Sequence, residues 1–244
     1  MDVHCKRFIT LLLLSIFLGV VNFLRVGYAE TVSYPNISVI VNQEYFDESK
    51  VTPAFIKQLN CISSKLNFKY KLFSSSSWIY IQYLFKYNHY DIIVNIDQSE
   101  LRDQYSSFSK PISKSTYVFA FKHKNNRKDL SNNIMKLLLD KKYYVAVKVG
   151  SAEMYQLSKY GITNFINAEN INEMVKLHND GIVDGFVTEL SRIKEFEKSN
   201  KLNFDKQYLF DINKGYYIHN SFINKYPNFL NDFNNALDEC TIKY

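Results

Sequence analysis

The sequence predicts an α/β fold of two lobes, each an open sheet with helices on its faces. Short apolar segments rich in β-branched residues alternate with segments whose apolar residues recur every three or four positions. This alternation begins near Ile37 and starts again near Tyr117. A chain of 244 residues is long enough to build two such lobes.

The first run of elements has the order β-α-β-α-β. Thr52-Pro53 predicts a helix start, and Phe55 and Leu59 lie on the inward face of that helix. Ser77 is placed to cap the next helix. The predicted elements are a strand at 37–42, a helix from 53 to about 66, a strand at 69–73, a helix at 78–87 and an entirely apolar strand at 91–96.

The second run begins with a predicted strand at 117–122, a helix at 130–140, a strand at 143–149 and a helix at 151–160. A helix from 170 to 180 and a strand at 185–190 follow. Two extended stretches at 208–212 and 215–219 then lead to a final helix from Pro227. Two crossover strands are expected to join the lobes, near Ser115–Tyr117 and Lys214–Tyr217. Lobe 1 is therefore predicted to comprise residues 30–116 plus 217–244, and lobe 2 residues 117–216.

Residues 1–29 have the layout of a cleavable secretory signal peptide. Lys6 and Arg7 precede an uncharged apolar run, and small residues precede a cut after Ala29. The run is short for a membrane span. Cys5 lies before the run, so it is not the lipid-modified cysteine of a lipoprotein. We therefore expect export to the periplasm.

Cys61 and Cys240 are the two cysteines that remain after cleavage. In an oxidising compartment two such residues can form a disulfide, and two buried thiols are the alternative. The sequence leaves both interpretations open.

Charge and residue types exclude several classes of function. The formal net charge is +6, but the lysines are spread out and form no basic stripe with aromatic residues, so no nucleic-acid partner is expected. The five histidines are scattered without metal-ligand spacing, and we expect no metal and no cofactor. No Cys/His nucleophile pattern is present.

Four sequence blocks resemble those of the family 3 periplasmic solute-binding proteins, the polar amino-acid receptors of ABC importers. The blocks are Trp78 with Tyr90-Asp91-Ile92-Ile93, Ser99-Glu100-Leu101-Arg102 with Phe108-Ser109-Lys110-Pro111, Val147–Glu153, and Gly181–Glu189. The resemblance covers nearly the whole chain after the signal peptide. It implies a periplasmic-binding-protein-like type II fold, in which a ligand cleft lies between the two lobes.

The resemblance also implies a site for a small ligand, an amino acid or another small carboxylate. Arg102 matches the family arginine, whose planar fork of donors holds a carboxylate bidentately. Ser99 adds a hydroxyl to that carboxylate, and Glu189 stands where the family acid takes the α-ammonium. The other implied ligand-binding residues are Trp78, Ser151, Ala152, Asn95, Asp97 and Tyr45. Core packing is the alternative for Trp78, and an ordinary helix N-cap is the alternative for Ser151.

Three departures from the family pattern affect the choice of ligand. Ala152 has no hydroxyl where the family has a threonine. The interval from Asp91 to Arg102 is one residue short, which predicts a reshaped loop at Asn95–Asp97. Tyr45-Phe46-Asp47-Glu48 replace the family's Gly-Phe block.

The expected function is capture of a small polar ligand by hinge closure, for import through an ABC permease that binds the closed form. We expect a monomer and no enzymatic activity. One alternative is a periplasmic dehydratase of the prephenate or arogenate type, with Glu189 or Glu44 as the general acid. The other is a sensor or interaction protein that has lost ligand binding.

Overall fold

The computed structural model describes residues 34–43, 54–122, 134–140 and 143–240. The predicted signal peptide, Glu44 and Tyr45 lie outside these ranges. Within them, nine strands form one sheet in the order β2-β1-β3-β9-β5-β8-β6-β7, with β4 also paired to β9.

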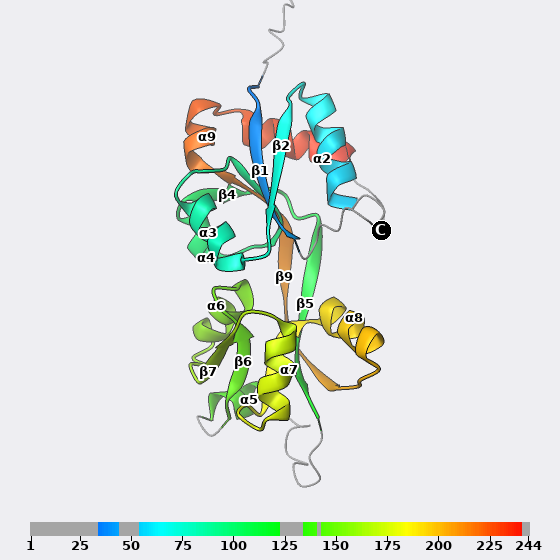
Figure 1. Cartoon of the computed structure of the whole chain (residues 1–244). Coiled ribbons are helices and arrows are strands. Elements are labelled where there is room, and N and C mark those ends of the chain that lie inside the picture. The colour runs from blue at the N-terminus through cyan, green and yellow to red at the C-terminus, as the bar shows by residue number, and fades with distance from the viewer. Residues whose placement is uncertain (1–33, 44–53, 123–133, 141–142, 241–244) are drawn as a thin grey trace, which may run out of the picture. The chain divides into compact units, whose positions relative to one another are not determined.

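The strands and helices fall into two lobes (Figure 1). Lobe 1 contains β1 (Ile37–Asn42), α2 (Ala54–Lys65), β2 (Tyr70–Ser75), α3 (Trp78–Lys86), β3 (Ile92–Asp97), α4 (Glu100–Asp103), β4 (Ser106–Phe108), α9 (Asn220–Lys225) and α10 (Phe229–Glu239). Lobe 2 contains α5 (Ile134–Leu139), β6 (Val145–Lys148), α6 (Ala152–Lys159), β7 (Phe165–Ala168), α7 (Ile171–Asn179), β8 (Gly185–Glu189) and α8 (Leu190–Asn200).

The two crossover strands predicted from the sequence are confirmed as β5 (Ser113–Phe121) and β9 (Asp205–His219), which belong to both lobes. They pair antiparallel from Ser113–Lys214 to Phe121–Asp205. In lobe 1 β9 pairs with β3, and in lobe 2 β5 pairs with β8. The predicted lobe boundaries, after residues 116 and 216, fall inside these two strands.

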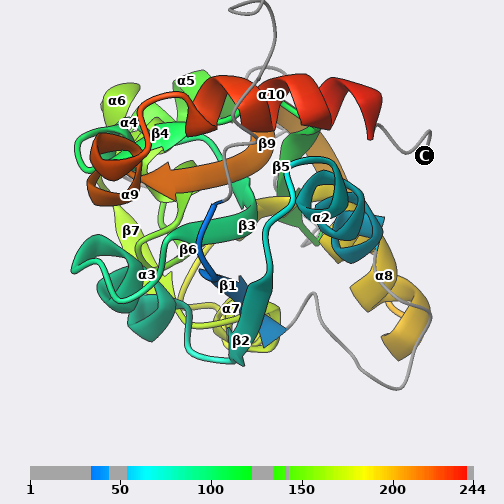
Figure 2. The ribbon, with the colours of Figure 1, turned by 90° about the horizontal axis from the view of Figure 1, so that it is seen from above.

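The core of lobe 1 follows the two-residue period of its strands. Val39 and Val41 of β1 point to the face covered by α2 and α10, and Ile40 points to the face covered by α3. Figure 2 shows α2 and α3 on opposite sides of these strands. Helices on both faces explain why the parallel strands are apolar throughout.

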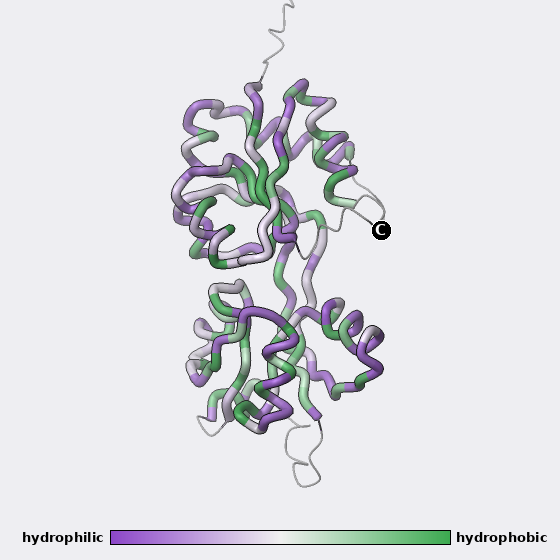
Figure 3. The backbone as a smooth tube through the Cα atoms, viewed as in Figure 1, coloured by the Kyte–Doolittle hydropathy of each residue, from purple (hydrophilic) through white to green (hydrophobic). Residues whose placement is uncertain are grey.

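Lobe 2 has the same two-sided plan. Phe119 and Val187 pack with α5 and α6 on one face, and Phe186 packs with α7 and α8 on the other. In Figure 3 the hydrophobic stretches coincide with the central strands of each lobe. Each lobe thus buries its own core, and the residues at the strand ends remain available for a site between them.

The Tyr90-Asp91 block has a structural role at Asp91. The Asp91 carboxylate accepts hydrogen bonds from the backbone N–H of Ser38 at 2.8 Å and from its hydroxyl at 2.6 Å. Since Ser38 lies in β1 and Asp91 directly precedes β3, these bonds fix the two parallel strands against each other.

The strand predicted at 91–96 is β3, and Asn95–Asp97, where the family comparison predicted a reshaped loop, form its end. The register of β3 against β9 shifts between Ile93 and Ile96, and Asn95 has a φ of 53°. This bulge inserts one residue, so that Ile93 and Ile96 both join the core under α3. Asparagine tolerates this left-handed conformation better than most residues, which explains its position at the bulge.

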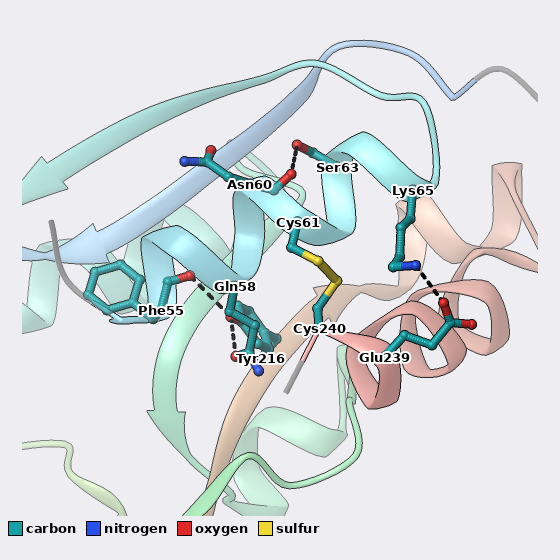
Figure 4. Close-up of a disulfide and its surroundings, with 9 residues drawn as sticks. All are labelled: Phe55, Gln58, Asn60, Cys61, Ser63, Lys65, Tyr216, Glu239 and Cys240. Carbon is teal, nitrogen blue, oxygen red and sulfur yellow. Dashed lines mark hydrogen bonds and ion pairs between the residues drawn. A yellow bond between two sulfur atoms is a disulfide. The ribbon is translucent and has the colours of Figure 1, made fainter. Parts of the chain in front are cut away.

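Cys61 and Cys240 form a disulfide that links α2 to the end of α10 (Figure 4). Their Cα atoms are 5.8 Å apart. Beside it, Tyr216 of β9 donates a hydrogen bond to Gln58 Oε1 at 2.9 Å, and both side chains are buried. Lys65 of α2 also forms an ion pair of 2.5 Å with Glu239 of α10, so α10 is joined to α2 by covalent and polar contacts within lobe 1.

Several elements differ from the sequence prediction. Helices α4, α8 and α9 and strands β4 and β7 were not predicted, and β9 is one strand of 15 residues where two separate stretches were expected. Among the described residues, no helix is long and apolar enough to cross a membrane. The same residues contain no group of three or more His, Cys, Asp or Glu side chains placed to hold a metal ion.

Candidate functional site

A small cavity of about 50 Å³ lies where the two lobes meet. At roughly 10–15 Å³ for each water this is room for about four water molecules. Both lobes contribute its walls, chiefly through residues at strand ends and helix starts. The lining residues are Asn42, Trp78, Val94, Asn95, Ile96, Asp97, Arg102 and Tyr117 on one side, and Lys148, Ser151, Ala152, Glu153, Ile171, Met174, Thr188, Glu189 and Arg192 on the other.

Arg102 is the most buried cation of the cavity wall. It lies in α4 and only 3% of it is exposed. Its Nη1 donates to Gln82 Oε1 at 3.2 Å and its Nη2 donates to the carbonyl oxygen of Asp97 at 2.7 Å. Its buried Nε has no hydrogen-bond partner among the described residues. Since a buried donor without an acceptor is costly, this N–H is suited to a ligand oxygen.

The guanidinium of Arg102 also lies between two aromatic rings. Its Cζ is 5.8 Å from the ring centroid of Trp78 and 5.7 Å from that of Tyr217. The Tyr217 hydroxyl is fixed in turn by hydrogen bonds to the carbonyl oxygen of Ser99 and to Asp103. Burial raises the pKa of this hydroxyl, and its hydrogen bond to Asp103 adds to the shift, so it remains a donor. Each ring attracts the cation through its π face.

Trp78 connects the lobes. Its indole Nε1 donates to the carbonyl oxygen of Gly150 at 3.3 Å. Nζ of Lys148, a residue of lobe 2, lies 5.8 Å from the same ring. Trp78 therefore contacts a cation from each lobe, Arg102 and Lys148, while lining the cavity.

The start of α6 places a buried carboxyl group in the cavity wall. Ser151 caps the helix, and its hydroxyl accepts from the N–H of Met154 at 3.3 Å. Glu153 follows in the first turn and is 6% exposed. Burial raises the pKa of Glu153 to about 7, and the charge of Asp97 adds to this, whereas hydrogen bonds from its own amide and from Ser151 oppose it. The group can exchange a proton near neutral pH.

Asp97 is held by two hydroxyl groups of β5. Ser115 donates to Oδ1 at 2.5 Å, and Tyr117 donates to Oδ2. Burial raises the pKa of Tyr117 well above its ordinary value, and the negative charges of Asp97 and Glu153 add to the shift, so the tyrosine stays protonated. These bonds join the lobe 1 wall of the cavity to a crossover strand.

Glu189, the predicted acceptor of a ligand ammonium, is bound by protein groups. Its Oε2 is 3.0 Å from Nζ of Lys214, and its Oε1 accepts from the hydroxyl of Ser191 at 2.8 Å. The pair is largely buried, with side-chain exposures of 9% for Lys214 and 14% for Glu189.

The structure brings most of the predicted ligand-binding residues together. Seven line the cavity: Trp78, Asn95, Asp97, Arg102, Ser151, Ala152 and Glu189. Ser99 does not; it is buried before α4 and lines a separate, open hollow of about 310 Å³. Its backbone N–H donates to the Tyr217 hydroxyl at 2.8 Å. Ser99 therefore contacts Tyr217, one of the two rings beside Arg102, and does not reach the cavity. Tyr45 lies outside the described residues.

Sequence reasoning missed three charged lining residues, Lys148, Glu153 and Arg192. Lys148 and Glu153 flank the Gly150-Ser151 turn, inside a block that the family resemblance had already marked. The signal in the sequence that could have identified them was a charged residue on each side of a strand-to-helix turn. Arg192 stands in the first turn of α8, a helix that was not predicted.

Comparison with known proteins shows the fold. No protein-family model matches the chain, and no curated protein matches it. Among solved structures, holo ArgBP from T. maritima has a TM-score of 0.66 at 16% identity, covering 85% of this chain and 91% of that one. An ancestral amino acid-binding protein, described as a precursor of cyclohexadienyl dehydratase, has a TM-score of 0.63 at 18% identity, with coverage of 84% and 88%.

A histidine kinase sensor domain described as similar to periplasmic binding proteins also matches, with a TM-score of 0.64 at 16% identity and coverage of 84% and 89%. Proteins with one architecture thus include amino-acid binders and a sensor domain. The fold alone does not decide among such functions. The chain has the type II fold of the periplasmic binding proteins, as the resemblance to the amino-acid-binding family implied.

Proposed function

We propose that the chain is a periplasmic solute-binding protein that encloses a small carboxylate ligand, an amino acid or another small carboxylate, between its two lobes. The observation that supports this best is Arg102. Its guanidinium is buried in the cavity wall beside two aromatic rings, and its Nε–H has no partner among the described residues.

The chemistry of Arg102 favours a carboxylate. A guanidinium has five N–H donors, and the two hydrogen bonds to Gln82 and Asp97 use two of them. Nε and one Nη of arginine form a fork that matches the two oxygens of a carboxylate. A buried, charge-assisted pair of this kind is stronger than a neutral hydrogen bond.

Closure of the lobes is the proposed binding motion. Glu100 of α4 accepts from the Tyr155 hydroxyl of α6 at 2.9 Å and forms an ion pair with Lys159. Together with the Trp78–Gly150 bond, these contacts join the lobes around the cavity. A ligand that contacts both lobes selects this closed form, with β5 and β9 as the hinge. Delivery to an ABC permease, with the protein acting as a monomer, follows from the family resemblance.

The periplasmic location is supported by the predicted signal peptide and by the disulfide. A disulfide between Cys61 and Cys240 fits an oxidising compartment.

Thermal shift measurements test the proposal. The purified protein is mixed with amino acids, small carboxylates without an amino group, and polyamines. A ligand at 100 times its dissociation constant stabilises a protein by about 2.7 kcal/mol, which is easily detected. Stabilisation by a carboxylate is expected in the wild type, lost in Arg102→Ala and strongly weakened in Arg102→Lys, which keeps the charge without the fork. Lys114→Ala, at an exposed position on β5, is the control. If no carboxylate stabilises the wild type, the proposal is wrong.

Glu153 supports a second candidate function, that of a periplasmic dehydratase. A buried acid with a pKa of about 7 in a cavity is suited to protonate a departing hydroxyl group, which leaves as water. It fits this role better than Glu189, which is paired with Lys214. Incubation with prephenate tests it: turnover that is lost in Glu153→Gln would establish the enzyme.

A further inference from the structure

Lys214 forms an ion pair with Glu189, the residue to which the family pattern assigns the ligand's ammonium. Its Nζ is 3.0 Å from Oε2, an ordinary distance for a charge-assisted hydrogen bond. The Ser191 hydroxyl holds the other oxygen. The acid that the family pattern assigns to the ligand is therefore neutralised by the chain itself.

The position of Lys214 is fixed by the sheet. It lies in β9 at the point where the strand passes between the lobes, with its Cα paired to Asp97 in β3 and to Ser113 in β5. Lys214 as a whole is 7% exposed. Because two neighbouring strands and an ion pair hold this lysine, moving it out of its site is energetically costly.

The other anionic group that faces the cavity from lobe 1 is also supplied with donors. Both carboxylate oxygens of Asp97 accept from hydroxyls of β5, and its carbonyl oxygen accepts from Arg102. In contrast, Arg102 keeps a buried N–H without an acceptor among the described residues. Lys148 and Arg192 bring two more cations to the wall. Arg102 therefore offers a buried donor for a ligand oxygen, whereas the carboxylates of Glu189 and Asp97 are both supplied with donors by the chain itself.

We propose that Lys214 replaces the ligand's α-ammonium at Glu189, so that the cavity selects small carboxylates without an α-amino group. This inference rests on the proposed function, because it takes carboxylate binding at Arg102 as given. An α-amino acid would bring its ammonium close to that of Lys214, and like charges at such distances repel strongly in a site shielded from water. A deamino acid fills the same volume without that repulsion.

Matched ligand pairs test the inference in the wild-type protein. Propionate is compared with L-alanine, succinate with L-aspartate, and glutarate with L-glutamate, by isothermal titration calorimetry at pH 7. The expected result is that, in the pair that binds, the deamino member binds at least about tenfold more tightly. Equal or tighter binding of the amino acid would overturn the inference and leave carboxylate binding at Arg102 standing. If no member of any pair binds, the proposed function itself fails.

Lys214→Met tests the role assigned to the lysine, because methionine keeps most of the length and removes the charge. The variant is expected to lose the preference or to reverse it in favour of the amino acid, since Glu189 becomes available. Lys206→Met is the matched control: Lys206 lies on the same strand and forms an ion pair of 2.6 Å with Glu197, which, unlike Glu189, does not line the cavity. A folded Lys214→Met protein with an unchanged preference would overturn the assignment. The wild-type comparison decides the ligand class even if this variant does not fold.

Discussion

Trp78 and Gly150 are joined by a hydrogen bond of 3.3 Å from the indole Nε1 to the carbonyl oxygen. Trp78 begins α3 in lobe 1, and Gly150 precedes α6 in lobe 2. The bond exists only while the lobes are in contact, so it stabilises the form of the protein in which the cavity is enclosed.

Trp78→Phe removes this hydrogen bond and keeps an aromatic ring near Arg102. A neutral hydrogen bond contributes about 0.5–1.5 kcal/mol, so we expect ligand affinity to fall roughly two- to tenfold. Titration calorimetry with the carboxylate that stabilises the wild type measures this. Tyr83→Phe, at an exposed position on the same helix, is the control and should bind as the wild type does. Unchanged affinity in Trp78→Phe would show that the bond does not contribute to closure.

Gly150→Ala should impair both stability and binding. Gly150 has a φ of 65°, and an added Cβ would lie 2.8 Å from Nε2 of Gln82, the residue that accepts from Arg102. The left-handed conformation costs a non-glycine residue about 1–2 kcal/mol, and displacement of Gln82 should disturb the guanidinium. Chemical denaturation and calorimetry measure the two effects.

Gly161→Ala separates these effects. Gly161 has a φ of 83°, but its added Cβ would meet Leu139 Cδ2 at an ordinary 3.5 Å. This variant should therefore lose a similar amount of stability and keep its ligand affinity. Equal affinity losses in both alanine variants would contradict the proposed role of the Gly150–Gln82 contact.

Glu153→Gln should change the pH dependence of stability. The folded-state pKa of about 7 lies above the ordinary value of 4.5, so the folded protein binds the extra proton and its stability falls as pH rises from 4.5 to 7. The shift corresponds to on the order of 3 kcal/mol, a loss that is complete above pH 7. Glutamine does not ionise, so the variant should gain stability relative to the wild type across this window.

Urea denaturation at pH 5, 6, 7 and 8 provides the measurement for Glu153. The groups that face it are Asp97, Arg192 and Tyr117, and none of these is changed by the substitution. Glu195→Gln, an exposed position on α8, serves as the control and should follow the wild-type profile. A difference between Glu153→Gln and wild type that does not vary with pH would refute the buried ionisation.

Removal of the disulfide should destabilise lobe 1 without changing the ligand site. Cys61 and Cys240 are separated by 179 residues, and loss of a native disulfide typically costs about 2–5 kcal/mol. The Cys61→Ser/Cys240→Ser variant should therefore melt at a lower temperature and no longer respond to reductant. Its ligand affinity below the melting temperature should match the wild type, because neither cysteine lines the cavity.

The strongly periodic elements could be predicted from the sequence. The strands that begin near Ile37 and Ile92 and the helix with Phe55 and Leu59 have apolar residues at the spacing that the fold requires. Helix α8 was missed because it has only three apolar residues, Leu190, Ile193 and Phe196, of which Ile193 alone is fully buried. Strand β9 looked like two stretches because the polar Asn213-Lys214 pair interrupts its apolar residues.

The site was predicted only in part, because local sequence patterns do not show which distant residues pair. Residue spacing within short family-like blocks identified Trp78 and Arg102, which both line the cavity. The pair of Glu189 and Lys214 joins residues 25 positions apart on different strands, and no local pattern reveals that pairing. The raised pKa of Glu153 depends on burial by other elements, so the sequence alone does not predict it.

The disulfide also bears on the order in which the lobes are completed. Helices α5 to α8 and strands β6 to β8 of lobe 2 occupy one continuous segment, whereas lobe 1 combines β1 to β4 with α9 and α10 from the other end of the chain. A chain synthesised from its N-terminus makes the whole of that segment before α10. We therefore expect lobe 2 to assemble first during export, and the oxidation of the Cys61 and Cys240 thiols to their disulfide, by a thiol oxidant of the oxidising compartment, to mark the end of folding.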